Sequence, residues 1–393
     1  MNTPESLQEP PNFSLDLGGP VYQILSRSHS ASPVQNLHRH AVICVLVCWV
    51  PLAVLSLVQG HFLGDTNLPF LRDIETHVRF LVALPALILA ELNVRRRIQP
   101  MLKRFVERHL INPEELPKFY AAVSAAVRLH NSVVVEIVLL VLVFTVGAWL
   151  WRHQLPLDVL SWYASSQGGQ IHLTMSGYWL AFVSVPIFQF ILVRWYIHIL
   201  IWIWFLLRIS YLNLYLQALH PDRAAGLGFV GKFSVVFEPL LFAQNALLSA
   251  QIVSRILYHG ESLLASEMTI FGYVLLSVAV ALVPLLSFAP QLMRAKRDGL
   301  ARYGNFASEF VTDFDRKWLQ GKVNDEEILS NNDIQSLSDL DNSFAMVSKM
   351  RPVPFSHDDV ILLLVAAIVP FLPLLLTIIP LDQLIVRVIK LVI

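Results

Sequence analysis

The stretch that decides the fold is residues 178–207, YWLAFVSVPIFQFILVRWYIHILIWIWFLL, in which Arg194 is the one charged side chain. As a helix, these 30 residues rise about 45 Å, which exceeds the roughly 30 Å of a bilayer's hydrocarbon core. The run forms either one long helix or two short spans. One continuous helix that reaches beyond the membrane is predicted, because the basic clusters on either side of the spans need an even number of crossings between them, and the absence of proline and glycine between Pro186 and Pro221 agrees. The sequence therefore indicates a membrane protein built of spanning helices.

The composition of the whole chain supports this class. Of its 393 residues, 55% are hydrophobic and 15% are charged, against about 25% charged in soluble domains, and the mean hydropathy is +0.58. These values exclude an ordinary soluble enzyme. The net charge of +0 gives no reason to expect a nucleic acid partner. The two cysteines, Cys44 and Cys48, both lie in the first apolar run, which excludes a disulfide framework.

Seven apolar runs are candidate spans, so the lipid bilayer is the first predicted partner. We predict an all-α polytopic membrane helix bundle of about seven spans with a helical cytoplasmic layer. The last run contains Pro370 and Pro373, so it forms either a kinked full span, which we favour, or a re-entrant pair of half-helices. The predicted spans are residues 41–58, 80–92, 133–151, 178–207, 233–257, 268–289 and 360–379.

Basic residues beside the spans predict the orientation, because lysine and arginine are retained on the cytoplasmic side. Seventeen fall in two regions, and the opposite loops with their flanks hold four. Both regions and the N-terminus are therefore predicted to be cytoplasmic, and the triplet Arg95, Arg96 and Arg97 is expected to hold anionic lipid headgroups. The seventeen are Arg95, Arg96, Arg97, Lys103, Arg104, Arg108, Lys118, Arg128, Arg294, Lys296, Arg297, Arg302, Arg316, Lys317, Lys322, Lys349 and Arg351.

The order of polar and apolar segments divides the chain into eight parts. The second cytoplasmic helix of the basic region is predicted to be continuous with the third span, and the sixth span to continue as a helix through Trp318. The parts are a mobile cytoplasmic tail (1–38), spans 1 and 2 (39–94), basic cytoplasmic helices (95–131), spans 3 and 4 (132–219), a glycine-rich loop (220–232), spans 5 and 6 (233–290), a cytoplasmic helical region with an acidic patch (291–357), and span 7 with an amphipathic C-terminal helix (358–393).

Polar side chains inside the spans are the candidate site residues, because a charge in hydrocarbon costs about 2.5 to 3.5 kcal/mol and should face protein or water. On the fifth span, Gln244, Gln251 and Arg255 are spaced to share one helical face. Such groups either join neighbouring helices, with ion pairs such as Arg194 to Glu136 or Glu238, or line a solute path. The candidate path comprises Glu136, Arg194, His198, Glu238, Gln244, Asn245, Gln251 and Arg255.

The most distinctive short string is HPDRAAGLGFVG, residues 220–231. Its end matches the GxGxxG pattern of dinucleotide-binding loops, but a helix precedes it where that fold needs a strand, so a structural turn is favoured. In that turn Asp222 caps a helix and the glycines allow close backbone approach. The alternative is a gating or ligand loop. Its candidate residues are His220, Asp222, Arg223, Gly226, Gly228 and Gly231.

Together with DIQSLSDLDNSFAMVSKMRPVPF at residues 333–355, this string resembles a family of uncharacterised bacterial multi-pass inner-membrane proteins. The resemblance implies a location in the bacterial inner (plasma) membrane and implies no activity.

Motifs of catalysis are missing from the sequence, which contains no HExxH, GxSxG or P-loop string. No catalytic residue, metal ligand or cofactor is therefore predicted, and an intramembrane enzyme is the least favoured class. We predict a channel or transporter for a small polar or ionic solute. The alternative is a membrane-embedded sensor or scaffold whose cytoplasmic layer binds a protein partner. The sequence leaves the number of subunits open, a homo-oligomer included.

Overall fold

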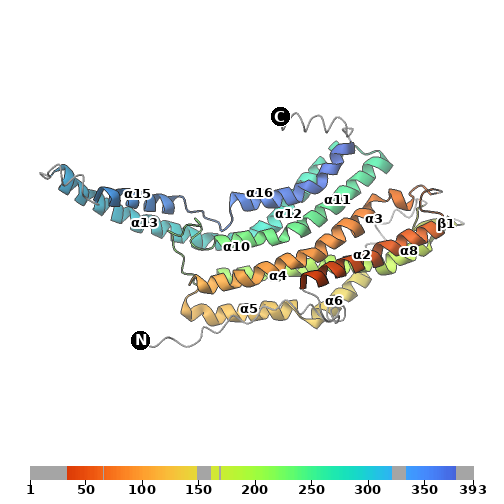
Figure 1. The fold of residues 1–393 in the computed structure, drawn as a ribbon, viewed down its shortest axis with the longest axis horizontal. Helices are drawn as coiled ribbons and strands as arrows, with labels where there is room; N and C mark the ends of the chain where they lie inside the picture. Colours follow the sequence, from red (N-terminus) through yellow and green to blue (C-terminus); the bar gives the residue numbers. More distant parts are fainter. Residues whose placement is uncertain (1–32, 65, 148–160, 168–169, 321–332, 378–393) are drawn as a thin grey trace.

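The computed structural model describes residues 33–64, 66–147, 161–167, 170–320 and 333–377, which form an elongated helical bundle (Figure 1). Within these residues, six helices are long and apolar enough to cross a membrane, and a bent pair, α5 and α6, makes a seventh crossing if it counts as one span. The predicted all-α polytopic bundle is confirmed. The main helices are α2 (Pro33–Val58), α3 (Ile74–His77), α4 (Leu84–Glu107), α5 (Leu116–His130), α6 (Val133–Leu142), α8 (Met175–Trp179), α9 (Val185–Ser210), α10 (Gly228–Phe233), α11 (Glu238–His259), α12 (Glu267–Leu282), α13 (Ala289–Phe314), α15 (Asp333–Ser348) and α16 (His357–Ile368).

Several of these helices are joined end to end without a loop. A π-helical turn, Leu180–Ser184, joins α8 to α9, so Met175–Ser210 is one helix of 36 residues, as predicted for the fourth span. The sixth span also continues as predicted, because Leu263–Leu319 runs through α12 and α13. The last span extends from α16 into the 3-10 turns Val369–Thr377, with no reversal of the chain at its prolines. Residues 1–32 of the predicted tail (1–38) and the C-terminal segment from 378 lie outside the described residues, whereas residues 33–38 belong to α2 rather than to a mobile tail.

A bend separates the basic helix α5 from the third span, where a continuous helix was predicted. The axes of the two helical segments differ by 44° at a break over Asn131 and Ser132. The Ser132 side chain accepts a hydrogen bond from the Val135 amide and caps α6, so a new helix begins there. The prediction was wrong because short polar side chains offer the backbone such local bonds in place of helical ones.

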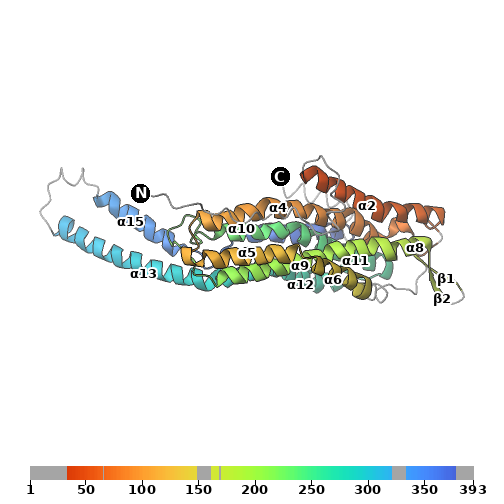
Figure 2. The same cartoon turned by 90° about the horizontal axis from the view of Figure 1, so that it is seen from below.

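Both arginine-rich regions lie at one end of the bundle, which we call the basic end (Figures 1 and 2). The guanidinium of Arg108 donates to the Gly226 carbonyl at 3.0 Å, and that of Arg351 donates to the Asp222 carbonyl at 2.9 Å. Side chains that follow the second span and precede the seventh thus meet the loop between the fourth and fifth spans. The predicted cytoplasmic segments form one contiguous layer.

The opposite end carries the antiparallel hairpin of β1 (Ala164–Gln167) and β2 (Gln170–Leu173), and we call it the hairpin end. There the buried Asp73 carboxylate accepts hydrogen bonds from the Trp162 indole at 2.9 Å and the Thr76 hydroxyl at 2.7 Å. Phe70 packs edge-on against Trp162, with ring centroids 4.9 Å apart. The segment before the second span is thereby fixed to the segment before the fourth.

Helices α13 and α15 form an arm that projects beyond the basic end in both views (Figures 1 and 2). The two helices approach closely where Gly299 faces Val347, because a Cβ atom at Gly299 would lie 3.0 Å from the Val347 side chain. Near the tip, Lys317 and Asp333 form an ion pair at 2.6 Å. The region 291–357, for which helices were predicted, therefore contains two packed helices, α13 and α15.

Candidate functional site

A cavity of about 490 Å³ opens on the side of the bundle between α2, α4, α6 and the α8–α9 helix, and we call it the side cavity. Its walls are almost wholly apolar, and the side chains at its mouth face outward: Phe182 is 61% and Phe144 is 54% exposed. In a bilayer these groups meet acyl chains. The lining residues on which the account depends are His40, Val47, Glu91, Val143, Phe182, Arg194, Trp195 and His198.

Two π-helical turns shape this cavity. Val143–Gly147 follows α6 and Leu180–Ser184 lies between α8 and α9, and both supply wall residues. A π turn inserts one residue into a helix and shifts the facing side chains, which is why such turns often occur at functional sites. The opening therefore lies where two spanning helices depart from regular α geometry.

One end of the side cavity is charged. The Arg194 guanidinium lies 3.9 Å from the Glu91 carboxylate, and these side chains are only 17% and 20% exposed. That distance is beyond the roughly 2.7–3.2 Å of a hydrogen bond, and the buried Nη2 of Arg194 has no hydrogen-bond partner within the described residues. His40 and His198 also line the cavity. The charged groups thus form a loose pair with donor capacity left on the guanidinium.

The depth of the charged end follows from the helices that carry it. Glu91 lies one turn before the Arg95–Arg97 triplet of α4, and His40 lies near the start of α2. Along α9, Arg194 is twelve residues, or about 18 Å, from Phe182. Half of a hydrocarbon core is about 15 Å. The distance from the charged end to Phe182 is therefore close to the thickness of one leaflet, with the charges toward the basic end and the apolar part toward the hairpin end.

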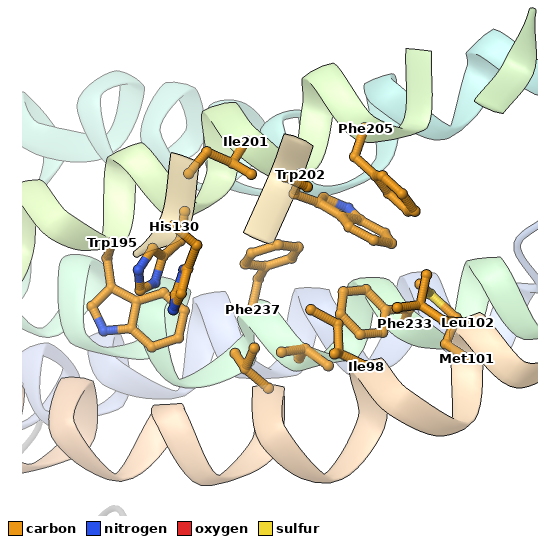
Figure 3. Close-up of a pocket in the computed structure, with 14 residues that line it drawn as sticks. Ile98, Met101, Leu102, His130, Trp195, Ile201, Trp202, Phe205, Phe233 and Phe237 are labelled. Carbon is orange, nitrogen blue, oxygen red and sulfur yellow. The ribbon is translucent and has the colours of Figure 1, made fainter. Parts of the chain in front are cut away.

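A second, smaller cavity of about 60 Å³ lies next to the first, and half of its lining residues carry aromatic or imidazole rings (Figure 3). Trp195 and His198 line both cavities and form the partition between them. The Trp195 indole is fixed by a 2.9 Å hydrogen bond to the Leu87 carbonyl, and the His198 ring lies 4.4 Å from that of His130. His130 is the last residue of α5 before the bend, so the bend places an imidazole against the partition.

The polar face predicted on α11 does not join the side cavity. Gln244 donates a hydrogen bond to the Tyr196 hydroxyl, and the buried Asn245 bonds the Leu241 carbonyl at 2.8 Å and the Ser277 hydroxyl at 3.3 Å. Gln251 and Arg255 share a face with Gln244 but are exposed on the bundle, and Arg255 interacts electrostatically with Glu75. The contacts of Gln244 with Tyr196, of Asn245 with Ser277 and of Arg255 with Glu75 join helices, as the interhelical alternative predicts.

The expected ion pairs of Arg194 were wrong, because its carboxylate partner is Glu91. Glu136 is buried near the start of α6 and Glu238 begins α11, and one oxygen of each lacks a hydrogen-bond partner within the described residues. Neither lines the side cavity. Glu91 was not singled out from the sequence, although a lone carboxylate near the end of an apolar run was a signal that could have identified it.

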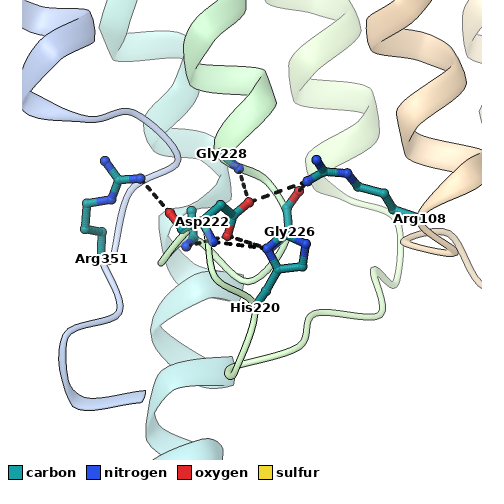
Figure 4. A network of polar contacts seen from close by, with 7 residues as sticks. Arg108, His220, Asp222, Gly226, Gly228 and Arg351 are labelled. Carbon is teal, nitrogen blue, oxygen red and sulfur yellow. Dashed lines mark hydrogen bonds and ion pairs between the residues drawn. The ribbon is translucent and has the colours of Figure 1, made fainter. Parts of the chain in front are cut away.

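The loop of residues 220–231 is organised around the Asp222 carboxylate (Figure 4). It accepts hydrogen bonds from three backbone amides, at 2.9 Å from Ala224, 3.1 Å from Gly226 and 2.9 Å from Gly228, the first residue of α10. Burial alone would raise the pKa of Asp222, but these amides and the nearby His220 lower the pKa below its ordinary value. The carboxylate is an intramolecular acceptor, as the structural-turn interpretation predicts.

The same loop is clamped by the segment that leads to α16. The Arg351 amide donates to the Arg223 carbonyl at 2.7 Å, and a Cβ atom at Gly231 would lie 2.5 Å from both the Pro354 oxygen and the Phe355 Cα. Glycine is needed at position 231 for this approach. The two strings that carry the family resemblance, residues 220–231 and 333–355, therefore meet in space and hold three segments of the basic end together.

No cluster of three or more histidine, cysteine, aspartate or glutamate side chains that could hold a metal ion occurs in the described ranges. Comparison with protein-family models, with curated proteins and with solved structures finds no match to this chain. By its helices, the chain is a multi-pass membrane protein.

Proposed function

We propose that this membrane protein binds an amphipathic, lipid-like molecule that enters the side cavity from the bilayer, and that it serves as a transporter for that molecule. The observation that carries the proposal is a cavity of about 490 Å³ on the side of the bundle, with apolar walls and charged groups at one end. Ligand cavities are typically about 300–1,000 Å³ and combine apolar walls with a few polar groups that fix orientation.

The substrate class differs from the small polar or ionic solute predicted from sequence. Walls made almost wholly of hydrocarbon cannot replace the hydration shell of an ion, whose desolvation is costly. An amphipathic molecule avoids this cost, because its apolar part meets the walls and its headgroup meets Glu91, Arg194 and the histidines. Transport thus remains the proposed class, with a lipid-like cargo.

Brominated amphiphiles test binding, because bromine on an acyl chain quenches tryptophan fluorescence on contact. We expect saturable quenching of Trp195 in the protein reconstituted in nanodiscs, and Trp195→Phe should remove the saturable part. Val47→Phe fills the mouth of the cavity and should weaken binding. Its matched control is Val280→Phe on α12, since both valines are similarly exposed, at 38% and 37%, and Val280 does not line the cavity. Equal quenching in both variants would refute the proposal.

We further propose that the protein lies in the bacterial inner membrane with its basic end in the cytoplasm. The positive-inside rule supports this orientation, because both arginine-rich regions gather at that end. Arg96 and Arg97 are exposed on α4, which suits the proposed contact of the triplet with anionic headgroups. Cysteines introduced at residue 303 and at residue 64 should react with an impermeant thiol reagent from opposite sides.

The α13–α15 arm favours a second function, a scaffold that binds a protein partner. The arm projects beyond the bundle and exposes Phe306, Leu319 and Met346. Replacing residues 310–339 with a short linker keeps the Gly299–Val347 contact at the base of the arm. Loss of a co-purifying partner with amphiphile binding unchanged would support the scaffold, and an unchanged pull-down would count against it.

A further inference from the structure

We propose that the charged end of the side cavity selects amphipathic molecules with an anionic headgroup, a phosphate or a carboxylate, and that Arg194 binds the anion. This inference rests on the proposed function, since it names the substrate class of the same cavity. It depends on the geometry of the Glu91–Arg194 pair and on the charges that face the cavity.

The Arg194 guanidinium has hydrogen-bond donor capacity that its contacts leave unused. Its guanidinium contacts Glu91 at 3.9 Å, and Nη2 is buried without a hydrogen-bond partner within the described residues. A guanidinium carries five N–H donors in a planar fork that matches carboxylate and phosphate oxygens. An unmade hydrogen bond from a buried charged donor is costly, so an anion that accepts it is bound favourably.

The charged side chains that line the side cavity favour an anionic headgroup over a cationic one. The described side chains that line the cavity include one acidic group, Glu91, against the guanidinium of Arg194 and the imidazoles of His40 and His198. A cationic headgroup would meet Glu91 only in competition with Arg194, which lies beside it. An anionic headgroup would meet the guanidinium and two ring nitrogen donors or acceptors, and it would displace Glu91 as the counter-ion of Arg194.

The position of Arg194 along its helix suits the headgroup of a single-chain amphiphile. Arg194 lies about 18 Å along its helix from Phe182 at the apolar end, close to the thickness of one leaflet. A single-chain amphiphile in this cavity therefore places its headgroup at the depth of the charged pair, close to the Arg95–Arg97 triplet of α4. Its chain lies along the apolar wall formed by the two π-helical turns.

Glu91 has a defined role in this scheme, because it neutralises Arg194 while the cavity holds no anion. Its carboxylate competes with the ligand for the same guanidinium. Glu91→Gln should therefore tighten anion binding several-fold, whereas Arg194→Gln should weaken it by about tenfold or more. A merely structural ion pair gives a different result, since loss of either partner would then weaken binding through misfolding.

The experiment is competition in nanodiscs of phosphatidylcholine, using quenching of Trp195 by a brominated alkyl phosphate as the readout. Chain-matched competitors are an alkyl phosphate, a fatty carboxylate, an alkyl glucoside and an alkyl trimethylammonium. The variants are Glu91→Gln, Arg194→Gln, Arg194→Lys and the double variant without either charge. The control is Arg208→Gln, because Arg208 lies on the same helix but outside the cavity, 5.6 Å over the Trp204 ring.

We expect both anions to compete more strongly than the glucoside and the trimethylammonium compound, with partial recovery in Arg194→Lys and no change in Arg208→Gln. The phosphate and carboxylate arms separate the two headgroup sources. If all four competitors bind equally and Arg194→Gln changes nothing, the anion selectivity is overturned while the proposed function stands. If neither the brominated alkyl phosphate nor a brominated alkyl glucoside shows saturable quenching, the proposed function itself fails.

Discussion

Replacing Asp222 should destabilise the basic end by an amount that the hydrogen bonds of its carboxylate allow us to work out. Oδ1 accepts from the amides of Ala224 and Gly226, and Oδ2 accepts from that of Gly228 and lies 3.7 Å from the Arg108 guanidinium. Asp222→Asn keeps one acceptor and loses the Oδ2 interactions, at a cost of about 1–3 kcal/mol. Asp222→Ala leaves all three amides without the carboxylate and should cost about 3 kcal/mol or more.

The free energy of unfolding can be measured by titrating the protein with sodium dodecyl sulfate in mixed micelles and following helix content by circular dichroism. A depressed pKa contributes stability above the ordinary pKa of aspartate, about 3.9, and loses it as the pH falls. The difference in the free energy of unfolding between the wild type and Asp222→Asn should therefore be largest at about pH 7 and decrease toward about pH 3. Asp341→Asn, at an exposed site on α15, is the control. If Asp222→Ala unfolds like this control, the proposed role of the loop is refuted.

Three further predictions address the glycine-rich loop and the spans. Gly231→Ala places a Cβ against the Phe355 backbone and should cost about 3 kcal/mol in the same titration, whereas Gly272→Ala, which meets nothing within 4 Å, should stabilise α12 by about 1 kcal/mol. Arg223 is exposed with a φ of 55°, so Arg223→Gly should stabilise the protein by about 1 kcal/mol, and a loss of stability would contradict the strain assigned to this residue. Gln244→Cys, in a background without the native cysteines, should resist an impermeant thiol reagent, because Gln244 contacts Tyr196. Rapid labelling would instead support the solute path that the sequence offered as an alternative.

The spans could be predicted because hydrophobic length is a local property of the sequence. A run such as 178–207 is too long and too apolar to be anything other than a spanning helix, and no proline or glycine follows Pro186 within it to break the helix. The bend after His130 was missed because Ser132 forms its cap with a backbone amide of its own helix, and that alternative competes closely with helix continuation.

The candidate site was predicted only in part. Arg194 and His198 could be identified because a polar side chain in hydrocarbon is energetically costly unless it faces protein or water. The partner of Arg194, however, depends on how α4 is aligned with α9. That alignment is a tertiary property that helical spacing does not carry. The π-helical turns that open the side cavity also leave no clear trace in the sequence, because a run that is mostly hydrophobic shows no periodic pattern that one inserted residue would shift.

The central proposal is that the side cavity binds an amphipathic molecule. Photo-cross-linking with an acyl chain that carries a diazirine tests this directly, with labelled positions mapped by peptide mass spectrometry. We predict saturable labelling at Phe182 in the cavity mouth, and only weak, non-saturable labelling at Phe271 of α12, which is similarly exposed at 65% but lines no part of the cavity. Equal labelling of the two phenylalanines at every probe concentration would contradict the account.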